Sequence, residues 1–356
     1  MKIVDFLKRI FLFLLIPVIL ISCNDDSVVE EPVFKLTPPS VFVVNEGNFT
    51  FGNSSLTYFN FRDSSVIQNL FYLVNKVPLG DVANFMKISN GRGYIVVNNS
   101  GIVYEIDIET GTFMGKITGL VSPREILILD NGKALISDLV ERSMSVVDLN
   151  GNGSLSKIDL DGYTSESMVV VNNKVYAGNW SGLYQDKKND QVLVIDAASL
   201  KLTDSIRVSL EPNSLLTDKN GDLWVLCSGG YLNEEYPALY KINTEADTVM
   251  RIYRFDDKMS NPVDLKIDGA GEELYYLDGS VFSMNISAAS LPEEPLVEAG
   301  SHHFYALGVD PATGRVMVSD ALDYTQKGKV LIYDRDGAYT GEFLAGITPG
   351  YFAFYE

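Results

Sequence analysis

The chain alternates short apolar runs with polar breaks, and the apolar runs recur in pairs whose second member ends in Asp or Asn. The seven second runs are LTYFNFR, VYEIDIE, MSVVDLN, VLVIDAA, LYKINTE, VFSMNIS and VLIYDRD, with the markers Asn60, Asp107, Asp148, Asp196, Asn243, Asn285 and Asp334. Successive markers lie 47, 41, 48, 47, 42 and 49 positions apart. A period of about 40 to 50 residues with several short strands per unit is typical of a β-propeller, in which each unit is one blade.

Two further sets of runs complete the expected inner part of each blade. The first runs of the pairs are VFVVNEGN, GYIVVNNS, KALISDLV, KVYAGNW, DLWVLCSG, ELYYLDGS and RVMVSDAL. Several of them are continuously apolar, as strands covered on both sides are. Upstream lie six innermost runs, VANFMKIS, PREILILD, SESMVVVN, EPNSLLTD, NPVDLKID and FYALGVDP. The run that begins at Val41 has no innermost partner before it, and the C-terminal GYFAFYE from Gly350 supplies the seventh, since an open sheet edge would otherwise remain.

The sequence therefore predicts an all-β fold, a seven-bladed β-propeller over residues 41–356, closed by the C-terminal strand pairing into the first blade. Outer, fourth strands are expected at VIQNLFYL, FMGKITG, SLSKIDL, KLTDSIRV, TVMRIYRF, PLVEAG and YTGEFLA. A ring of six blades is the competing count.

The N-terminus predicts export and lipidation. Lys2, Lys8 and Arg9 precede an apolar run from Ile10 to Ile21, which fits the central region of a signal peptide over residues 1–22. Leu20-Ile21-Ser22-Cys23 matches the lipobox of bacterial lipoproteins, in which the Cys becomes the lipidated N-terminus. An N-terminal anchor helix with an incidental Cys23 is the alternative.

Residues 23–40 then read as a lipidated acidic tether. Asp25 and Asp26 directly follow the lipidation site and resemble the surface-export signal of Bacteroidetes lipoproteins, whereas a plain solvated tail is the simpler reading. The expected location is the outer membrane at the cell surface, with the protein held by its lipid anchor.

The net charge of the chain limits the classes of partner that it can bind, and its second cysteine is expected to be structural. The formal net charge is −19 for the whole chain and becomes −21 once residues 1–22 are removed. So acidic a protein, without a basic run, is repelled by phosphate backbones, and nucleic acid is excluded as a partner. The second cysteine, Cys227, lies in the apolar run DLWVLCS and is expected to be a small buried thiol.

Function is expected on one face of the ring, where the loops between second and third strands meet the loops that lead into the inner strands. Four of the former loops are long: EGNFTFGNSS, SGLYQDKKND, GGYLNEEYPA and ALDYTQKG. The candidate ligand-binding residues on this face are Asn48, Phe49, Asn84, Arg124, Glu166, Trp180, Tyr184, Asn213, Tyr231, Tyr236, His303, Tyr305, Tyr324 and Tyr351, with Phe51 as a further exposed ring. Aromatic rings mixed with amides and charges suit a bulky, partly flat ligand rich in amides or hydroxyls. For any single ring, packing between blades is the alternative.

Catalytic patterns are scarce. No phosphate-binding loop, G-x-S-x-G or H-E-x-x-H motif occurs, and neither a cofactor nor a metal site is predicted. The best enzymatic constellation is Glu125, Asp264 and Asn84 or Asn213, whose oxygens could hold Ca²⁺. A polar lining of the funnel is the simpler reading. Of the two adjacent histidines, His302 is expected to be the more exposed.

One local motif carries a family resemblance. Asn45-Glu46-Gly47-Asn48-Phe49, followed by Asn53-Ser54-Ser55-Leu56-Thr57-Tyr58-Phe59 and preceded by the lipobox, resembles the YncE-like propeller lipoproteins of Bacteroidetes, and among them the BtuG-type surface proteins. The resemblance implies a non-enzymatic protein that binds a corrinoid such as vitamin B12 and delivers it to a TonB-dependent outer-membrane transporter.

Other functions stay open at this point. A receptor for a glycan or a siderophore would use the same aromatic face. A hydrolase similar to the metal-dependent lactonase propellers is a further alternative, although that group has six blades. A purely structural role, in which the face docks only a partner protein, is the last.

Overall fold

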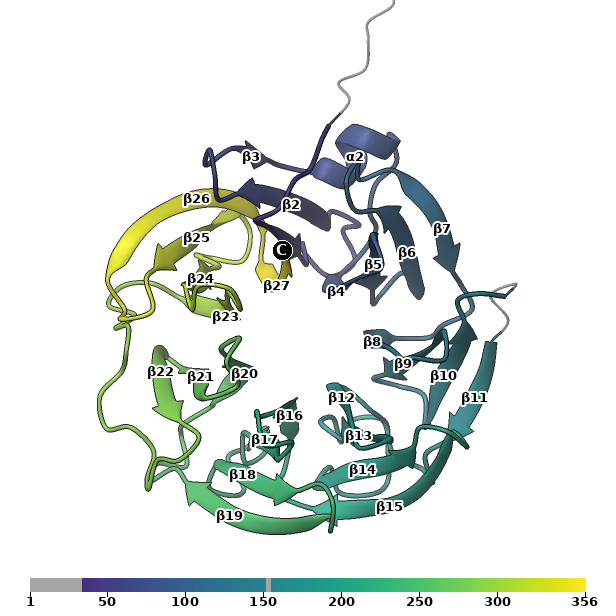
Figure 1. Ribbon diagram of the computed structural model, residues 1–356, viewed down its shortest axis with the longest axis vertical. Coiled ribbons are helices and arrows are strands. Elements are labelled where there is room, and N and C mark those ends of the chain that lie inside the picture. The colour runs from purple at the N-terminus through teal and green to yellow at the C-terminus, as the bar shows by residue number, and fades with distance from the viewer. Residues whose placement is uncertain (1–33, 152–154) are drawn as a thin grey trace, which may run out of the picture. The chain divides into compact units, whose positions relative to one another are not determined.

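The computed structural model describes residues 34–151 and 155–356, and the signal peptide, Cys23 and most of the tether lie outside this part of the chain. The described residues form seven small antiparallel sheets arranged as blades around a central axis (Figure 1). The predicted seven-bladed propeller is therefore confirmed. No helix in this part of the chain is long and apolar enough to cross a bilayer.

The strands follow one another outward from the axis in every blade. Blade 1 consists of β27 (Pro349–Tyr355), β1 (Ser40–Asn45), β2 (Ser55–Asn60) and β3 (Val66–Ile67). Blade 2 consists of β4 (Ala83–Ser89), β5 (Arg92–Val97), β6 (Ile102–Asp107) and β7 (Phe113–Ile117), and blade 3 of β8 (Pro123–Ile128), β9 (Lys133–Asp138), β10 (Ser143–Asp148) and β11 (Leu155–Asp159). Blade 4 consists of β12 (Met168–Val171), β13 (Lys174–Gly178), β14 (Gln191–Asp196) and β15 (Lys201–Arg207).

The remaining blades repeat this order with one exception. Blade 5 consists of β16 (Pro212–Thr217), β17 (Leu223–Cys227), β18 (Ala238–Asn243) and β19 (Thr248–Arg254). Blade 6 has only β20 (Val263–Ile267), β21 (Glu273–Asp278) and β22 (Ser280–Asn285). Blade 7 consists of β23 (Phe304–Val309), β24 (Val316–Asp320), β25 (Lys327–Tyr333) and β26 (Tyr339–Ile347).

The ring is closed by its last strand. β27 pairs antiparallel with β1 from Ser40 opposite Tyr355 to Asn45 opposite Pro349, so blade 1 joins the two ends of the described chain. Phe352 is 6% exposed and belongs to the apolar cluster between blades 1 and 7. The predicted role of the C-terminal run is confirmed.

The hydrophobic core is divided among the interfaces between blades. Seven apolar clusters occur in the described chain, and each lies between two neighbouring blades. β17 shows why its sequence is continuously apolar: Trp224 and Leu226 enter the cluster shared with blade 6, whereas Val225 and Cys227 enter the cluster shared with blade 4. Cys227 is fully buried, as expected, and burial raises the pKa of its thiol well above the ordinary value.

The recurring Asp or Asn markers cap the turn that follows the third strand of each blade. In all seven blades the side-chain oxygen of the marker accepts a backbone N–H two to four residues further on. Asp334, for example, accepts from Asp336 at 3.0 Å and from Ala338 at 2.8 Å. Such Asx turns satisfy amides that would otherwise lack a partner, which explains the repetition of the two residue types.

The capping role makes a stability prediction. Replacing Asp334 by Ala removes the Oδ1 atom that accepts both of these N–H groups and is expected to lower the free energy of unfolding by about 1 kcal/mol. Urea denaturation followed by circular dichroism measures the change. The neighbouring Asp336→Ala, which removes an exposed carboxylate of the same turn, is the matched control and is expected to change stability by less than about 0.5 kcal/mol. Equal losses in the two variants would contradict the capping role.

Two predicted outer strands are wrong in part. The run VIQNLFYL forms only the two-residue β3 and then the helix α2 (Leu70–Asn75), because Leu70 and Phe71 turn into the core between blades 1 and 2. The run PLVEAG forms no strand and pairs only through the bridge of Val281 with Val297. Its Val297 and Leu296 pack instead into the apolar cluster between blades 6 and 7.

Candidate functional site

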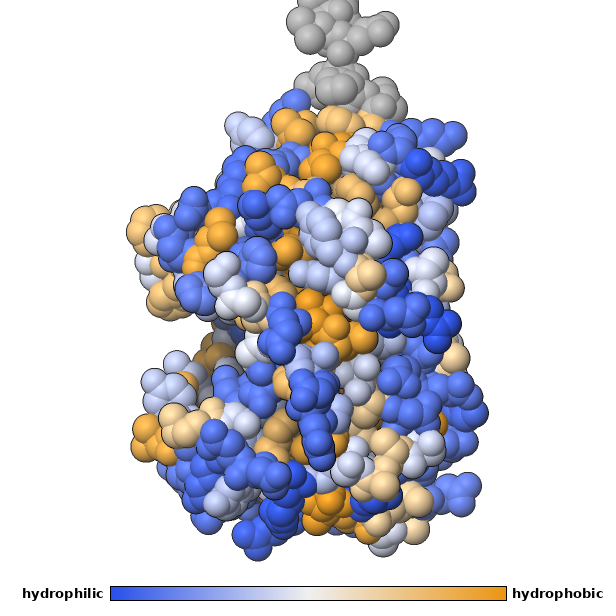
Figure 2. Space-filling view, turned by 90° about the vertical axis from the view of Figure 1, so that its left-hand side faces the viewer, coloured by the Kyte–Doolittle hydropathy of each residue, from blue (hydrophilic) through white to orange (hydrophobic). Residues whose placement is uncertain are grey.

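One face of the ring carries the long loops. In each blade the loop from the second to the third strand and the loop leading into the next inner strand lie on the same side, here called the upper face. Loops 45–55, 178–191, 227–238 and 320–327 on this face are the four that sequence length singled out. Figure 2, seen from the side of β22, β25 and β26, shows that one face of the ring is hollowed between two projecting parts.

The tips of these loops expose large apolar side chains. Phe49, Phe51 and Tyr231 are 67%, 76% and 87% exposed. Tyr184, Tyr236 and Tyr324 are also exposed, each by nearly half. Three further exposed side chains on this face, Leu183, Leu232 and Met259, were not predicted. The predicted apolar candidates were all aromatic, although the aliphatic residues beside Tyr184 and Tyr231 carried the same signal.

The first long loop is held in a fixed conformation despite its exposure. Thr50 has φ 72°, a left-handed conformation that is costly for a β-branched residue. The Asp81 carboxylate accepts the Thr50 N–H at 3.0 and 3.1 Å. The Asn48 side chain donates to the Tyr324 carbonyl at 2.6 Å and so joins the loops of blades 1 and 7. Phe49 is therefore presented to solvent by a braced loop.

The long loops of blades 4 and 5 are braced in a similar way. Asn179 is fully buried and exchanges two hydrogen bonds with Gln185, at 2.8 and 2.9 Å. The adjacent Trp180 is partly buried, and the Arg124 guanidinium lies 5.9 Å from its ring centroid. In blade 5 the Lys258 ammonium lies 5.3 Å from the ring centroid of Tyr236. These contacts hold the candidate rings Trp180 and Tyr236 in defined positions.

Polar side chains at the upper ends of the inner strands surround the axis of the ring. Six of the seven, all but β12, shift register with their neighbour near the upper end, which is the mark of a β-bulge. A bulge adds one residue to the strand and redirects its side chain. The residues at these positions and the corresponding residue before β12 include Asn84, Arg124, Glu166, Asn213 and Tyr305. These five, all predicted site residues, define what is called the mouth below.

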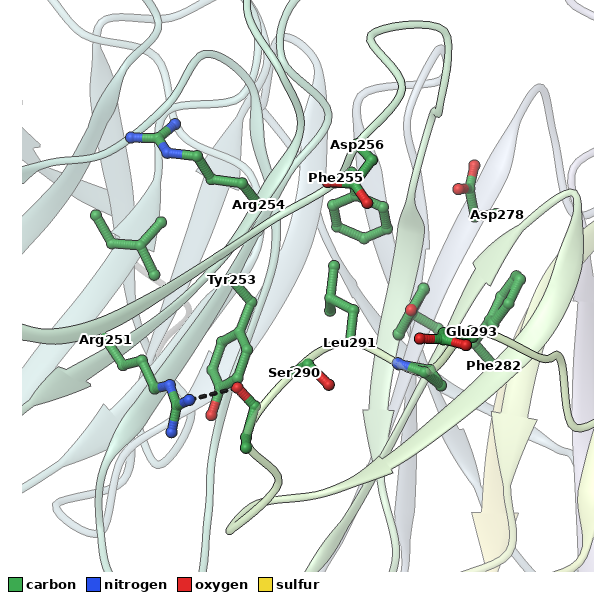
Figure 3. Close-up of a pocket in the computed structure, with 14 residues that line it drawn as sticks. Arg251, Tyr253, Arg254, Phe255, Asp256, Asp278, Phe282, Ser290, Leu291 and Glu293 are labelled. Carbon is green, nitrogen blue, oxygen red and sulfur yellow. Dashed lines mark hydrogen bonds between the residues drawn. The ribbon is translucent and has the colours of Figure 1, made fainter.

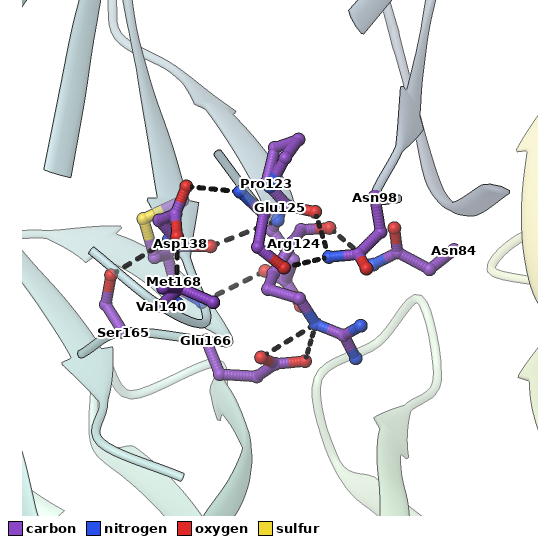
Figure 4. Close-up of polar contacts among 12 residues, drawn as sticks. Asn84, Asn98, Pro123, Arg124, Glu125, Asp138, Val140, Ser165, Glu166 and Met168 are labelled. Carbon is purple, nitrogen blue, oxygen red and sulfur yellow. Dashed lines mark hydrogen bonds and ion pairs between the residues drawn. The ribbon is translucent and has the colours of Figure 1, made fainter. Parts of the chain in front are cut away.

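Arg124 and Glu166 form the central ion pair of the mouth (Figure 4). The Arg124 Nε lies 2.7 and 2.8 Å from the two carboxylate oxygens of Glu166. Asn84 donates to the Arg124 carbonyl at 2.7 Å, and Asn213 donates to the Pro262 carbonyl at 2.9 Å. Burial raises the pKa of the Glu166 carboxyl, although the positive charge of Arg124 opposes the effect.

Glu46 contacts the mouth through Tyr305 and was not among the predicted site residues. The Tyr305 hydroxyl donates to both of its carboxylate oxygens at 3.0 Å, and burial raises its pKa against that hydrogen bond. A Cβ on Gly350 would lie only 2.3 Å from Glu46 Oε1, so the glycine leaves the space that the carboxylate fills. The adjacency of Glu46 to the candidate Asn48 and the glycine in the closing strand were the available signals.

Below the mouth the axis is hollow. A cavity of about 540 Å³ is lined by residues of all seven inner strands, mostly apolar, with Phe85 and Tyr351 near its upper end. Two charged side chains, those of Glu125 and Lys266, line the upper part of this cavity. Burial raises the Glu125 pKa to about 7, and burial also raises the pKa of the Tyr351 phenol. Tyr351 therefore lines this axial cavity, called the channel below, and lies in β27 rather than in a loop.

The carboxylates proposed as Ca²⁺ ligands already have protein partners. Glu125 Oε2 accepts the Met168 N–H at 3.0 Å, and Asp264 accepts the Leu307 N–H at 2.6 Å while it pairs with Lys266. Within residues 34–151 and 155–356, no group of three or more His, Cys, Asp or Glu side chains is placed to hold a metal ion. The constellation is better described as the polar lining of the channel.

The two histidines are arranged in the reverse of the expected order. His302 Nδ1 lies 2.6 Å from Asp320 Oδ2 and its ring stacks on Phe304 at 5.9 Å. His303 is the more exposed residue, although its Nδ1 lies 2.8 Å from the Leu322 carbonyl. The expectation for His302 is wrong because it faces a buried carboxylate, which the sequence places 18 residues away.

A second hollow lies outside the upper face. Its volume is about 530 Å³, and it lies between the outer strand β19 of blade 5 and blade 6, where the fourth strand is missing (Figure 3). Its walls are joined to each other, since Arg251 donates to the Ala289 carbonyl and the Tyr253 hydroxyl to the Ala288 carbonyl. None of the predicted site residues lines it.

Comparisons with solved structures agree on the fold. A quinoprotein alcohol dehydrogenase-like protein from Bacteroides thetaiotaomicron is 15% identical with a TM-score of 0.69, and the match covers 89% of this chain and 78% of that one. A periplasmic gluconolactonase from Pseudomonas aeruginosa is 12% identical with a TM-score of 0.65, covering 89% and 99% of the two chains. Virginiamycin B lyase from Staphylococcus aureus is 11% identical with a TM-score of 0.58, covering 73% and 83%. Identities this low indicate a shared architecture only.

Comparison of the sequence with known families and curated proteins gives one match. No curated protein matches the chain. The profile described as "Domain of unknown function (DUF5074)" matches residues 40–343, which is nearly the whole ring.

Proposed function

Since the chain belongs to the DUF5074 family, whose function is unknown, we propose from its upper face that it binds a bulky, flat, amide-edged ligand, a corrinoid such as vitamin B12, without catalysing a reaction. The observation that carries the proposal is the set of exposed rings on four long loops around a polar mouth. Exposed apolar side chains gathered on one face mark binding surfaces in soluble proteins.

The two parts of the face suit the two parts of such a ligand. Rings such as Trp180 and Tyr231 offer flat apolar area with few bonds to freeze on binding. Asn84 and Asn213 at the mouth offer amide groups, which can pair with the amides at the edge of a corrin. The braced conformation of loop 45–55 reduces the ordering cost that binding would otherwise carry.

The cellular setting is part of the proposal. The lipobox at Cys23 and the acidic tether support a protein held at the outer-membrane surface by a lipid. The resemblance to the BtuG-type proteins supports delivery of the ligand to a TonB-dependent transporter. A glycan or siderophore receptor is the nearest alternative, because the same rings would serve it. Hydrolysis is left out of the proposal because Glu125 and Asp264 already have protein partners.

Calorimetric titration of residues 24–356 with cyanocobalamin tests the proposal. Saturable binding is expected, and Trp180→Ala and Tyr231→Ala are each expected to weaken it about tenfold through the loss of ring contact. Tyr339→Ala removes an exposed ring from the outer strand β26, away from the upper face, and is the control. If neither heat nor a spectral change is seen at micromolar protein, the corrinoid assignment is refuted. If Tyr339→Ala weakens binding as much as the two loop variants do, the assignment of the binding site to the upper face is refuted.

A further inference from the structure

The Arg124 guanidinium has N–H donors that no residue of 34–151 and 155–356 accepts. Among these residues only Glu166 is bound, through both of its carboxylate oxygens to Arg124 Nε. Neither terminal nitrogen, Nη1 or Nη2, has a hydrogen-bond partner among the residues of the described ring. Figure 4 shows these two nitrogens directed away from the Glu166 carboxylate. Together the two nitrogens carry four N–H donors of the guanidinium.

The guanidinium is held in place at both ends. Its backbone lies in the bulge of β8, with the carbonyl bound by Asn84 at 2.7 Å. Its Nε is fixed by Glu166, and its charge lies 5.9 Å from the ring centroid of Trp180. The Arg124 side chain is 20% exposed, so it is largely removed from water without being sealed off. A fixed, partly desolvated guanidinium binds anions more strongly than a mobile surface one.

A guanidinium whose terminal nitrogens are open recognises a particular chemistry. Its two terminal N–H groups match the spacing of two oxygens on a carboxylate or a phosphate. It has no acceptor, so it cannot pair with the N–H groups of the ligand. The other charged side chain of the mouth pair, Glu166, is already used to orient Nε.

We propose that Arg124 binds an anionic group of the ligand, a phosphate or a carboxylate, through Nη1 and Nη2, while Glu166 and Trp180 position the guanidinium. This inference rests on the proposed function, since it assigns the ligand of the same face a negative charge at the mouth. Two acidic side chains, Glu46 and Glu125, lie nearby, and burial raises the pKa of both carboxyls, that of Glu125 to about 7, which favours their neutral forms beside Arg124.

The role of a negative charge on the ligand can be tested by comparing two corrinoids. Cyanocobalamin carries one phosphodiester, and dicyanocobinamide lacks it. Arg124→Gln is expected to weaken the binding of cyanocobalamin by about ten- to a hundredfold and to leave that of dicyanocobinamide within about threefold. Arg124→Lys keeps the charge without the fork and is expected to fall between. Arg335→Gln, which removes an exposed arginine from the turn after β25 on the opposite face, is the matched control.

The outcomes separate this inference from the proposed function. If cyanocobalamin binds wild type and both Arg124 variants equally, and circular dichroism shows all of them folded, the function stands and the inference is overturned. If neither corrinoid binds wild type, the function fails, and equilibrium dialysis with labelled inorganic phosphate decides the inference. Saturable phosphate binding that is lost in Arg124→Gln but kept in Arg335→Gln would support it, and no saturable binding would overturn it.

Discussion

Removing residues 349–356 is expected to abolish cooperative folding of the ring. β27 supplies the inner strand of blade 1, pairs with β1 along its whole length and packs against β4 and β23. Its loss would expose the edge of β1 and the apolar clusters on both sides of blade 1. Loss of the buried Phe352 side chain alone costs about 3 to 5 kcal/mol, which is comparable to the whole stability of many domains.

Thermal unfolding followed by circular dichroism, together with a protease-resistance assay, measures the effect of the truncation. Phe352→Ala is expected to remain folded with a reduced melting temperature, and removal of the exposed Glu356 alone is the matched control. A truncated chain that unfolds in one sharp transition within about 1 kcal/mol of wild type would show that the ring does not depend on its closing strand.

The stability of the ring is expected to fall between about pH 4.5 and 7 because of Glu125. Burial raises the pKa of this carboxyl to about 7, against an ordinary value of 4.5. In that window the unfolded chain loses the proton while the folded chain retains it, so raising the pH favours unfolding. A difference of about 2.5 pKa units corresponds to about 3 kcal/mol, which is fully present as stability below pH 4.5 and lost once the pH passes 7.

Glu125→Gln isolates this contribution. The Gln oxygen can accept the Met168 N–H that Glu125 Oε2 accepts now, but the side chain no longer titrates. The stability of the variant relative to wild type is therefore expected to rise by about 3 kcal/mol between pH 4.5 and 8. Urea denaturation across that range measures it. Glu245→Gln, at an exposed turn, controls for the loss of one negative charge, and parallel pH profiles for wild type and Glu125→Gln would refute the assignment.

The blade count was predictable because its signals are local. A strand covered on both sides must be apolar throughout, as β17 is, and a tight turn selects Asp or Asn, as Asp334 illustrates. The closing strand followed from counting, since one blade lacked an inner run. The outer strands were less predictable, because a fourth strand has one exposed side and carries a weaker pattern. Neither α2 nor the unpaired run at Pro295 could be separated from such a weak pattern.

The sequence predicted which face of the ring carries the candidate site, but it did not predict which side chains contact each other there. Loop length placed Phe49 and Tyr231 on the exposed upper face, where they lie. The pairing of Arg124 with Glu166 joins positions 42 residues apart on neighbouring blades, and it depends on bulges that a sequence pattern does not reveal. Glu46 was missed for the same reason, since its space is provided by Gly350, which follows 304 positions later.

The turn-capping residues and the long loops lie on opposite faces, since the third-to-fourth-strand turns lie on the side away from the upper face. Residues that specify the fold and residues offered to the ligand therefore do not compete for the same positions. Mutations in the four loops can alter what the protein captures while the seven caps keep the ring intact. The architecture leaves specificity free to diverge among descendants of one ring without a matching loss of foldability.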